Sequence, residues 1–249
     1  MILPSKYKAP PKLLEDKVIM ITGAGSGIGK EAAFTFAKFG ANTILIGKNI
    51  SHLEQTYDLF LKNNLKEPVL HLLDLEKAEE ADFKKISEAV LNEYGKLDGL
   101  LNNAGILGIK MPLENYPISQ WRKVFRINLE ASFLLTKSLL IALKKPKDSS
   151  VVFTSSGVGR RARAYWGAYS LTKFATEGLV QILSQELENT SCIRVNAINP
   201  GPVRTNMRLK AYPAEDPKIN PEPKDIMNAY LYLMGKDSLN FSGNSIEAQ

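Results

Sequence analysis

The sequence predicts an α/β protein built on one doubly wound parallel sheet of about seven strands, with helices on both faces. Short apolar runs alternate along the chain with longer segments whose apolar residues recur at helical spacing. A glycine-rich turn at residues 23–29 joins the first apolar run to the first helical segment, as in folds that bind dinucleotides. Because no linker, repeat or low-complexity segment divides the 249 residues, we expect a single domain spanning residues 1–249.

The expected elements alternate strictly after an irregular arm at residues 1–16. Strands are expected at residues 17–22, 42–46, 69–73, 97–101, 151–154, 193–198 and 245–247, and helices at residues 30–39, 51–63, 78–94, 119–143, 167–187 and 225–234. Ser51 is the expected N-cap of the second helix, with Glu54 completing a capping box. Strands that alternate with helices in this way pair in parallel through right-handed connections.

The chain changes character at residues 212–224, where four prolines fall within a short stretch. Proline removes a backbone donor and breaks regular elements, so this stretch is expected to form a loop. It follows the carboxyl end of the sixth strand, on the edge of the sheet where ligands bind in such folds. We therefore favour a substrate loop over about residues 207–224, and the alternative is a mobile surface loop.

Composition limits the classes of function. Hydrophobic residues make up 44% of the chain and charged residues 23%, which is typical of a soluble globular protein. The sequence has neither an apolar run long enough for a membrane span nor the apolar core of a signal peptide, so we expect a cytoplasmic protein without a membrane partner. The net charge of +6 is spread along the chain without a nucleic-acid-binding pattern, so no nucleic-acid partner is expected. The single cysteine, Cys192, cannot build a zinc site with His52 and His71, so no metal is expected.

Tyr169 and Lys173 lie four residues apart in an expected helix and therefore project from one face of it. An ammonium group close to a phenol favours the phenolate and lowers the pKa of the phenol from about 10. Such a pair is suited to proton transfer near neutral pH. Considered alone, the same spacing also fits an ordinary amphipathic helix.

The end of the second strand indicates which dinucleotide the fold prefers. In NAD-binding folds an acidic residue about 20 positions beyond the glycine turn binds the adenosine ribose hydroxyls. Gly47 stands at that position, and no Asp or Glu lies between Lys48 and His52. The missing carboxylate removes the repulsion of a 2′-phosphate, and Lys48 adds a cation. We therefore expect NADP(H) to be preferred, with NAD(H) as the alternative cofactor. The other interpretation of Lys48 is a solvated loop lysine.

Several motifs, taken in order, resemble the signature of the short-chain dehydrogenase/reductase family, which has a Rossmann fold. They are residues 22–29 (TGAGSGIG), residues 102–105 (NNAG), Asn128, Ser156, Tyr169-x-x-x-Lys173 and Pro200-Gly201. The resemblance covers about residues 14–206, and within the family the chain resembles YciK-like bacterial oxidoreductases, a group without an assigned substrate. The tail at residues 242–249 departs from the family because it lacks the Gly-Gly pair that many members carry.

The resemblance implies catalytic roles for four residues. Tyr169 would be the general acid in carbonyl reduction and the base in alcohol oxidation, while Lys173 would lower its pKa and bind the nicotinamide ribose. Ser156 would polarise the substrate oxygen, with Ser155 as the competing candidate, and Asn128 would hold a water molecule for proton relay. The implied reaction is hydride transfer between a nicotinamide cofactor and a small-molecule carbonyl or secondary alcohol, without a metal ion.

The resemblance also implies cofactor contacts from the glycine turn and from the carboxyl ends of the strands. Together with Lys48, the expected positions are Gly23, Gly25, Ser26, Gly27, Ile28, Gly29, Asn49, Asp74, Leu75, Asn102, Ala104, Gly105, Tyr169, Lys173, Pro200, Gly201, Val203 and Thr205. The expected substrate positions are Ser156, Val158, Arg163, Trp166, Met207 and Tyr212, beside Ile106, Leu107 and Gly157. They favour a ketone or aldehyde with an apolar body. A substrate that also carries an acidic group facing Arg163 is the alternative. Solvated loop charges are the preferred interpretation of the three arginines Arg160, Arg161 and Arg163.

Two other functions stay open at this point. A dehydratase or epimerase would use the same Tyr169 and Lys173 pair, and a catalytically silent, cofactor-sensing protein would keep the fold and lose turnover. Assembly follows from the expected helices at residues 119–143 and 167–187, which carry more apolar residues than one buried face requires. Family members pair these two helices between subunits, so we expect a homodimer or homotetramer of closed symmetry.

Overall fold

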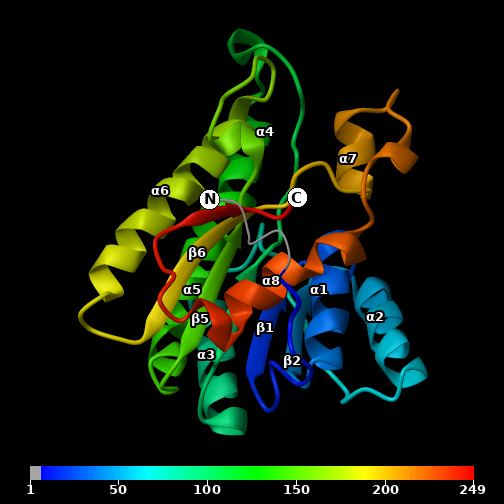
Figure 1. The fold of residues 1–249 in the computed structure, drawn as a ribbon. Coiled ribbons are helices and arrows are strands. Elements are labelled where there is room, and N and C mark those ends of the chain that lie inside the picture. Colours follow the sequence, from blue (N-terminus) through cyan, green and yellow to red (C-terminus); the bar gives the residue numbers. More distant parts are fainter. Residues whose placement is uncertain (1–6) are drawn as a thin grey trace.

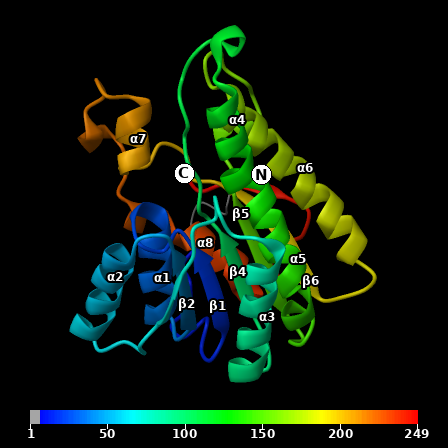
Figure 2. The ribbon, with the colours of Figure 1, turned by 180° about the vertical axis from the view of Figure 1, so that it is seen from behind.

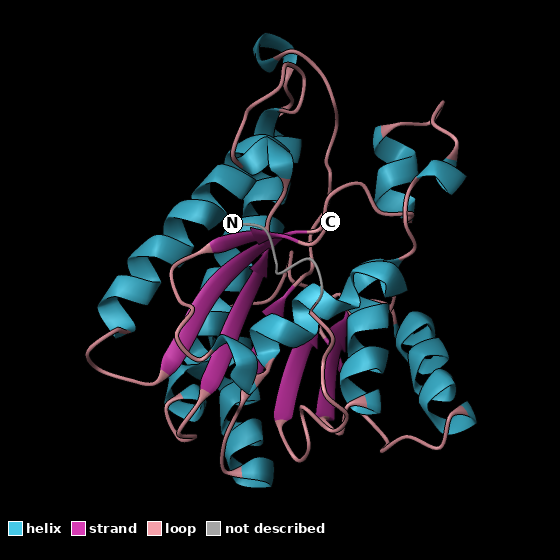
Figure 3. Ribbon diagram, viewed as in Figure 1, coloured by secondary structure: helices cyan, strands magenta, loops and turns pink. Residues whose placement is uncertain are grey.

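Seven parallel strands form one sheet in the computed structural model, which describes residues 7–249 (Figures 1 and 3). The strands are β1 (Val18–Thr22), β2 (Asn42–Gly47), β3 (Val69–Leu72), β4 (Gly99–Asn102), β5 (Ser149–Thr154), β6 (Ile193–Asn199) and β7 (Ser245–Glu247). Their order in the sheet is β3-β2-β1-β4-β5-β6-β7. Every pairing is parallel, which confirms the predicted doubly wound α/β fold.

Helices cover both faces of the sheet (Figures 1 and 2). One face carries α1 (Gly27–Lys38), α2 (Ile50–Lys62) and α8 (Met227–Met234), and the other carries α3 (Glu80–Tyr94), α5 (Ala131–Leu143) and α6 (Gly167–Leu187). The predicted helix at residues 119–143 is present but not uniform: α4 (Ile118–Phe125) continues through a π-helical turn, Arg126–Glu130, into α5. A short helix, α7 (Asn206–Ala211), projects beyond the carboxyl ends of the strands (Figure 1).

Alternate residues of each strand enter opposite core layers, because side chains along a strand point to opposite faces of the sheet. In β1, Ile19 and Ile21 belong to the layer shared with α1 and α8, whereas Val18 and Met20 belong to the layer shared with α3, α5 and α6. Both faces of this parallel sheet are covered, so its central strands are apolar on both sides.

The start of α2 differs from the prediction. The helix begins at Ile50, and its N-cap is Asn49, whose Oδ1 accepts a hydrogen bond from the backbone N–H of His52 at 3.1 Å. Ser51 lies inside the first turn, so the predicted capping box of Ser51 and Glu54 is wrong. The physical reason is that β2 extends to Gly47, which leaves Asn49 as the residue where extended backbone becomes helix.

The arm at residues 7–16 is irregular, as predicted, but it contributes to the core. Leu13 and Leu14 are buried in the layer formed with α1 and α8. Tyr7 donates a hydrogen bond from its hydroxyl to Asp237 at 2.8 Å. Residues 1–6, the rest of the predicted arm, lie outside the described residues.

The proline-rich stretch at residues 212–224 contains no α-helix or strand, in agreement with the prediction. It holds the short 3₁₀ turn Pro217–Ile219 and the start of a second, Pro223–Ile226. Arg204 fastens the stretch to the end of β6, because its guanidinium donates into the first turn and pairs with Glu222 at 3.0 Å. These contacts therefore hold the stretch to the segment that follows β6.

No helix within residues 7–249 is long and apolar enough to cross a membrane. Cys192 is exposed directly before β6, at the opposite edge of the sheet from α7.

Candidate active site

Two adjoining cavities of about 260 and 270 Å³ lie at the carboxyl ends of the strands. They share Gly23, Ser26, Ala104 and Gly105 in their walls. These residues follow β1 and β4, the neighbouring strands at which the chain reverses its direction across the sheet. A reversal of this kind is where doubly wound folds bind their ligands. The two cavities together form one candidate binding cleft.

The glycine turn brings backbone close to this cleft. Gly23 and Gly27 have φ of 69° and 53°, a left-handed conformation that favours glycine. A Cβ on Gly29 would clash with the carbonyl oxygen of Gly23, so α1 packs tightly on the end of β1. Ser26, the N-cap of α1, makes no capping bond from its side chain, and the first turn is left available to an anion. The turn therefore fits the pyrophosphate of a dinucleotide.

The cavity of about 270 Å³ is the candidate site for the adenosine half of the cofactor. Its walls contain several predicted positions, namely Gly25, Lys48, Asn49, Asp74 and Leu75, and also Ile106. They also contain His52, which lies over Gly25 and which the sequence analysis did not select. His52 could have been found from the sequence if Asn49 had been recognised as the N-cap of α2. It would then lie in the first turn of that helix, next to the cavity.

The cavity of about 260 Å³ brings together the other predicted groups. Its walls contain Gly27, Ile28, Leu107, Ser156, Trp166, Tyr169, Lys173, Pro200, Gly201, Val203, Thr205 and Met207. They also contain residues that the sequence analysis missed, namely Asn103, Thr154, Asn206, Arg208 and Ala211. Three of these, Asn206, Arg208 and Ala211, lie on α7, where Thr205 Oγ1 caps the helix by accepting from the backbone N–H of Arg208 at 3.2 Å.

Tyr169 is buried in the wall of this cavity and is hydrogen-bonded to Ser156. Burial raises the pKa of the Tyr169 phenol, and the hydrogen bond with Ser156 opposes that rise. The neighbouring Ser155 points elsewhere, to Glu177, with 2.5 Å between its Oγ and the carboxylate. Of the two candidate serines, Ser156 is therefore the one beside the phenol, as expected for adjacent residues of an extended segment.

Lys173 lies one helical turn beyond Tyr169, and its Nζ donates to the carbonyl oxygen of Thr154 at 2.6 Å. Its Nζ is 5.7 Å from the centre of the Tyr169 ring. Burial lowers the pKa of Lys173 to about 8, while the charge of Glu177 acts in the opposite direction. The pKa of Tyr169 is therefore raised in this structure, and not lowered by Lys173 as the sequence predicted. Both groups are buried, and desolvation disfavours the charged form of each.

Asn128 occupies the π-helical turn and lines neither cavity. Its side-chain amide accepts from the backbone N–H of Ile106 at 2.8 Å and donates to the Ile106 carbonyl at 2.9 Å. It also donates to Thr172 Oγ1 at 3.3 Å. The residue connects the segment after β4 to α6, and its role in proton relay stays a prediction.

Asn103, rather than the predicted Asn102, faces the cleft. Asn102 is buried and donates to Thr136 Oγ1 at 2.9 Å behind the sheet. Asn103 donates from Nδ2 to the Thr22 carbonyl at 3.2 Å and accepts from Thr154 Oγ1 at 3.4 Å. It therefore fastens the ends of three neighbouring strands beneath the cleft.

The predicted substrate positions divide into two groups. Ser156, Trp166 and Met207 line the cavity, whereas Val158, Arg163 and Tyr212 do not. Arg163 is exposed, and its Nη1 is 3.5 Å from the Tyr212 hydroxyl.

Arg160 does not fit its interpretation as a solvated loop charge. It pairs with Glu177 at 3.3 Å and also with Glu247, and it donates to the Ile246 carbonyl at 3.3 Å. No residue near Arg160 in the sequence indicates this network, because the partners lie on distant elements. Arg161 and Arg163 are exposed, as that interpretation expects.

Within residues 7–249 no cluster of His, Cys, Asp and Glu is arranged to hold a metal ion. The polar groups of the site are instead a phenol, a hydroxyl, an ammonium group and the backbone of the glycine turn. This set fits a dinucleotide cofactor and a substrate whose oxygen exchanges a proton.

Comparisons with known proteins agree with this geometry. Residues 17–216 match the short chain dehydrogenase family. The chain is 43% identical to the oxidoreductase YciK of Escherichia coli K12 over 98% of this chain and 96% of that protein. A short chain dehydrogenase structure from Pseudomonas syringae superposes with a TM-score of 0.97 at 45% identity and covers 100% of both chains. A Shigella flexneri short chain dehydrogenase complexed with NADP has a TM-score of 0.94 at 43% identity, over 96% of this chain and 100% of that one. The chain thus belongs to the short-chain dehydrogenase/reductase family of oxidoreductases.

Proposed function

We propose that this protein transfers a hydride between NADP(H) and a small-molecule carbonyl or secondary alcohol, with Tyr169 as the general acid and base. The observation that carries the proposal is the contact between Ser156 and Tyr169 in the wall of a cavity, with Lys173 one helical turn behind.

The residues divide the work of reduction between them. Bound NADPH supplies the hydride. The Ser156 hydroxyl hydrogen-bonds the substrate oxygen, and Tyr169 gives that oxygen its proton. Since burial raises the pKa of Tyr169, the phenol holds its proton at neutral pH, which suits the direction of carbonyl reduction. When the phenol gives up that proton, the ammonium group of Lys173 stabilises the negative charge of the phenolate.

A preference for NADP(H) is supported by the end of β2. Gly47 and Lys48 both line the cavity of about 270 Å³, and Lys48 is exposed there. Within residues 7–249, Lys48 has no carboxylate partner in an ion pair, so its ammonium group is available to a 2′-phosphate. The related Shigella flexneri structure was determined with NADP.

The walls of the cavity of about 260 Å³ favour an uncharged substrate body. Leu107, Trp166, Met207 and Ala211 provide apolar surface. Arg208 also lines the cavity, but Glu215 pairs with it at 2.5 Å and cancels its charge. With Arg163 outside the cavity, we favour a neutral ketone or aldehyde over a carbonyl acid.

The test is a screen of the purified protein with NADPH against carbonyl compounds. Each neutral compound is paired with a counterpart of similar size that carries a carboxylate. We expect NADPH consumption with neutral ketones or aldehydes and slower consumption with their carboxylated counterparts. Binding of NADPH without consumption across the whole panel would contradict the proposal.

A further inference from the structure

The loop that presents Ser156 is attached along one face of α6. It comprises residues 155–160, directly after β5. The carbonyl oxygen of Val158 accepts from Ser170 Oγ at 2.5 Å. The backbone of Gly159 packs so closely on Lys173 that a Cβ there would lie 2.7 Å from the Cβ of Lys173. The position of the loop is therefore determined by its contacts with α6.

Glu177 joins the two ends of this loop. Its Oε1 accepts from Ser155 Oγ at 2.5 Å and from Arg160 Nε at 3.3 Å. Ser245 Oγ, from β7, donates to the same oxygen at 2.9 Å. The Glu177 side chain is only 13% exposed, so these contacts are shielded from water. A single carboxylate thus closes the loop on both sides of Ser156.

The charge of Glu177 is not cancelled by its partner, because Arg160 is shared. The guanidinium of Arg160 also pairs with Glu247, which accepts from Asn199 Nδ2 at 2.6 Å. Two carboxylates therefore meet one guanidinium. The excess negative charge lies one helical turn beyond Lys173 on α6.

The surroundings of Lys173 contain few other charges. On α6 the ionisable groups acting on it are Tyr169 and Glu177. From β5 it meets the neutral carbonyl of Thr154, and from the segment after β4 and the π-helical turn it meets Gly105 and Asn128, which are also neutral. Glu177 is the carboxylate among them, so its charge is the one that keeps Lys173 protonated.

We propose that Glu177 is a positioning residue of the active site, which closes the loop that presents Ser156 to Tyr169 and balances the charge of Lys173. Glu177 lines neither cavity and acts on the site through Ser155, Arg160 and Lys173. The proposal rests on the proposed function for its kinetic consequences, but the protonation of Lys173 can be measured without turnover.

The first test is an NMR titration of protein labelled with ¹³C at the lysine Cε, with the Lys173 signal assigned by its loss in Lys173→Arg. Glu177→Gln keeps the size of the side chain and removes its charge. We expect the pKa of Lys173 to fall by about one unit, the lower end of the effect of a nearby opposite charge. Glu186→Gln, an exposed residue of the same helix, is the control and leaves the titration of Lys173 unchanged.

The second test is the pH profile of kcat. In the proposed function the protonated form of Lys173 is the active one. If the pKa of Lys173 falls, the side chain loses its proton, and the enzyme its activity, at a lower pH. The alkaline limb of the profile therefore moves to lower pH in Glu177→Gln, with about tenfold less activity on that side for a shift of about one unit. A role in folding alone would reduce activity equally at every pH and leave the limb in place.

Ser155→Ala keeps the charge of Glu177 and removes the hydrogen bond that holds one end of the loop to it. We expect a lower kcat, an unchanged titration of Lys173 and an unchanged dissociation constant for NADPH. This variant also decides the positioning role if Glu177→Gln does not fold. An unchanged Lys173 pKa in Glu177→Gln, or full kcat in Ser155→Ala, overturns the proposal. Absence of turnover in the unmodified protein overturns the proposed function instead, and the NMR titration still tests the charge balance.

Discussion

Polar side chains at the amino ends of the strands are paired within the protein, whereas those at the carboxyl ends face the cleft. At the amino edge, Lys17, Asp98, Asp148 and Arg194 form closed pairs with one another and with backbone groups. At the carboxyl edge, the corresponding ends of the same strands carry glycine turns, Ser156 and Asn103, which face the cleft. The same strands therefore supply a sealed end and a reactive end.

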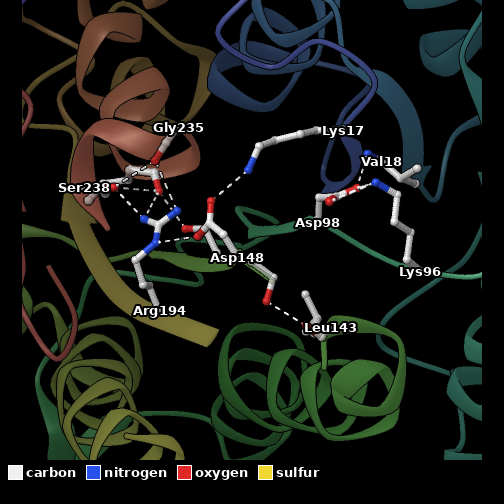
Figure 4. A network of polar contacts seen from close by, with 12 residues as sticks. Lys17, Val18, Lys96, Asp98, Leu143, Asp148, Arg194, Gly235 and Ser238 are labelled. Atoms are coloured by element: carbon white, nitrogen blue, oxygen red, sulfur yellow. Dashed lines mark hydrogen bonds and ion pairs between the residues drawn. The ribbon is translucent and has the colours of Figure 1, made fainter. Parts of the chain in front are cut away.

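Figure 4 shows how completely the amino edge is paired. Asp148 accepts from Lys17 Nζ and from Arg194 Nε, each at 3.0 Å. The guanidinium of Arg194, only 4% exposed, also donates to the carbonyl of Gly235 at 3.1 Å. It donates to the carbonyl of Leu233 at 2.8 Å as well. Partners of this kind are what a buried charge requires.

The two edges should therefore respond differently to substitution, with stability affected at the amino edge and chemistry at the carboxyl edge. A residue whose polar atoms are all used within the protein contributes to folding. A residue held next to a cavity contributes to binding or reaction, often at some cost in stability.

The largest effect is expected from Tyr169→Phe. Loss of the phenolic proton should reduce turnover by about 10²–10⁴-fold, while the dissociation constant for NADPH and the urea midpoint stay close to those of the unmodified protein. Tyr165→Phe, which changes an exposed phenol nearby, is the matched control and should keep full activity. Near-normal rates in Tyr169→Phe would remove Tyr169 from the chemistry.

The opposite pattern is expected from Arg194→Met. Removing one partner of a buried ionic network costs about 3 kcal/mol of unfolding free energy, because Asp148 loses one of its two cations and the carbonyls of Leu233 and Gly235 each lose a charged donor. The rate per folded molecule should not change. Urea unfolding measures the loss, and Lys137→Met, which breaks an exposed pair with Glu80, should leave the midpoint almost unchanged. A large fall in kcat in Arg194→Met would show that the two edges are coupled.

A smaller effect is expected at the adenosine end of the cleft. The unmodified protein should bind NADPH about ten- to a hundredfold more tightly than NADH, since one charge-assisted contact contributes about 1.5–3 kcal/mol. Gly47→Asp with Lys48→Ala should reverse this order, by adding a repulsive carboxylate and removing the cation. The new Cβ at Gly47 would lie 3.1 Å from Leu53 Cδ2, the end of a flexible side chain, so the change is compatible with the fold.

Fluorescence titration at low salt measures both affinities without substrate. Lys62→Ala, a lysine at the far end of α2, is the control and should leave both unchanged. Equal affinities for NADPH and NADH in the unmodified protein would contradict the proposed preference.

The smallest effect is expected in assembly. We propose that the outer face of α5 and α6 pairs two subunits in closed symmetry, as dimer or tetramer. Of the apolar residues that favoured this expectation, Leu135, Leu139 and Val180 are buried in the core, but Phe133 and Ile182 are 44% and 58% exposed. These two are the residues that a partner would cover.

Sedimentation velocity at micromolar concentration tests the assembly. Phe133→Glu with Ile182→Glu should weaken association by about tenfold or more, because charges are depleted in the core of interfaces. Leu61→Glu, 46% exposed on α2, should leave assembly unchanged. A monomeric unmodified protein would contradict the proposal.

The fold and the centre of the cleft could be predicted from sequence because they depend on local patterns. Apolar runs define the strands, and the carboxyl ends of parallel strands meet at one edge, which is where the cleft lies. The spacing of Tyr169 and Lys173 fixes their common face on α6. Each of these inferences needs only neighbouring residues and the period of the element.

What could not be predicted depends on contacts between distant segments. Arg160 and Glu247 are separated by 87 positions, and nothing near Arg160 in sequence marks it as a network residue. The raised pKa of Tyr169 has the same origin, since its cause is burial by several elements and not the neighbouring Lys173. The place of Asn128 in a π-helical turn is also invisible to a pattern that assumes a uniform helix.

The position of Cys192 has a practical consequence for experiments on this protein. It is the single cysteine of the sequence, it is exposed, and it precedes β6 at the edge opposite the cleft. A maleimide reagent would therefore attach one dye or one surface linker per molecule, at a fixed point away from the cofactor and substrate. Molecules immobilised through this thiol would all present the open cleft to solution, which allows ligand binding to be recorded on an oriented layer.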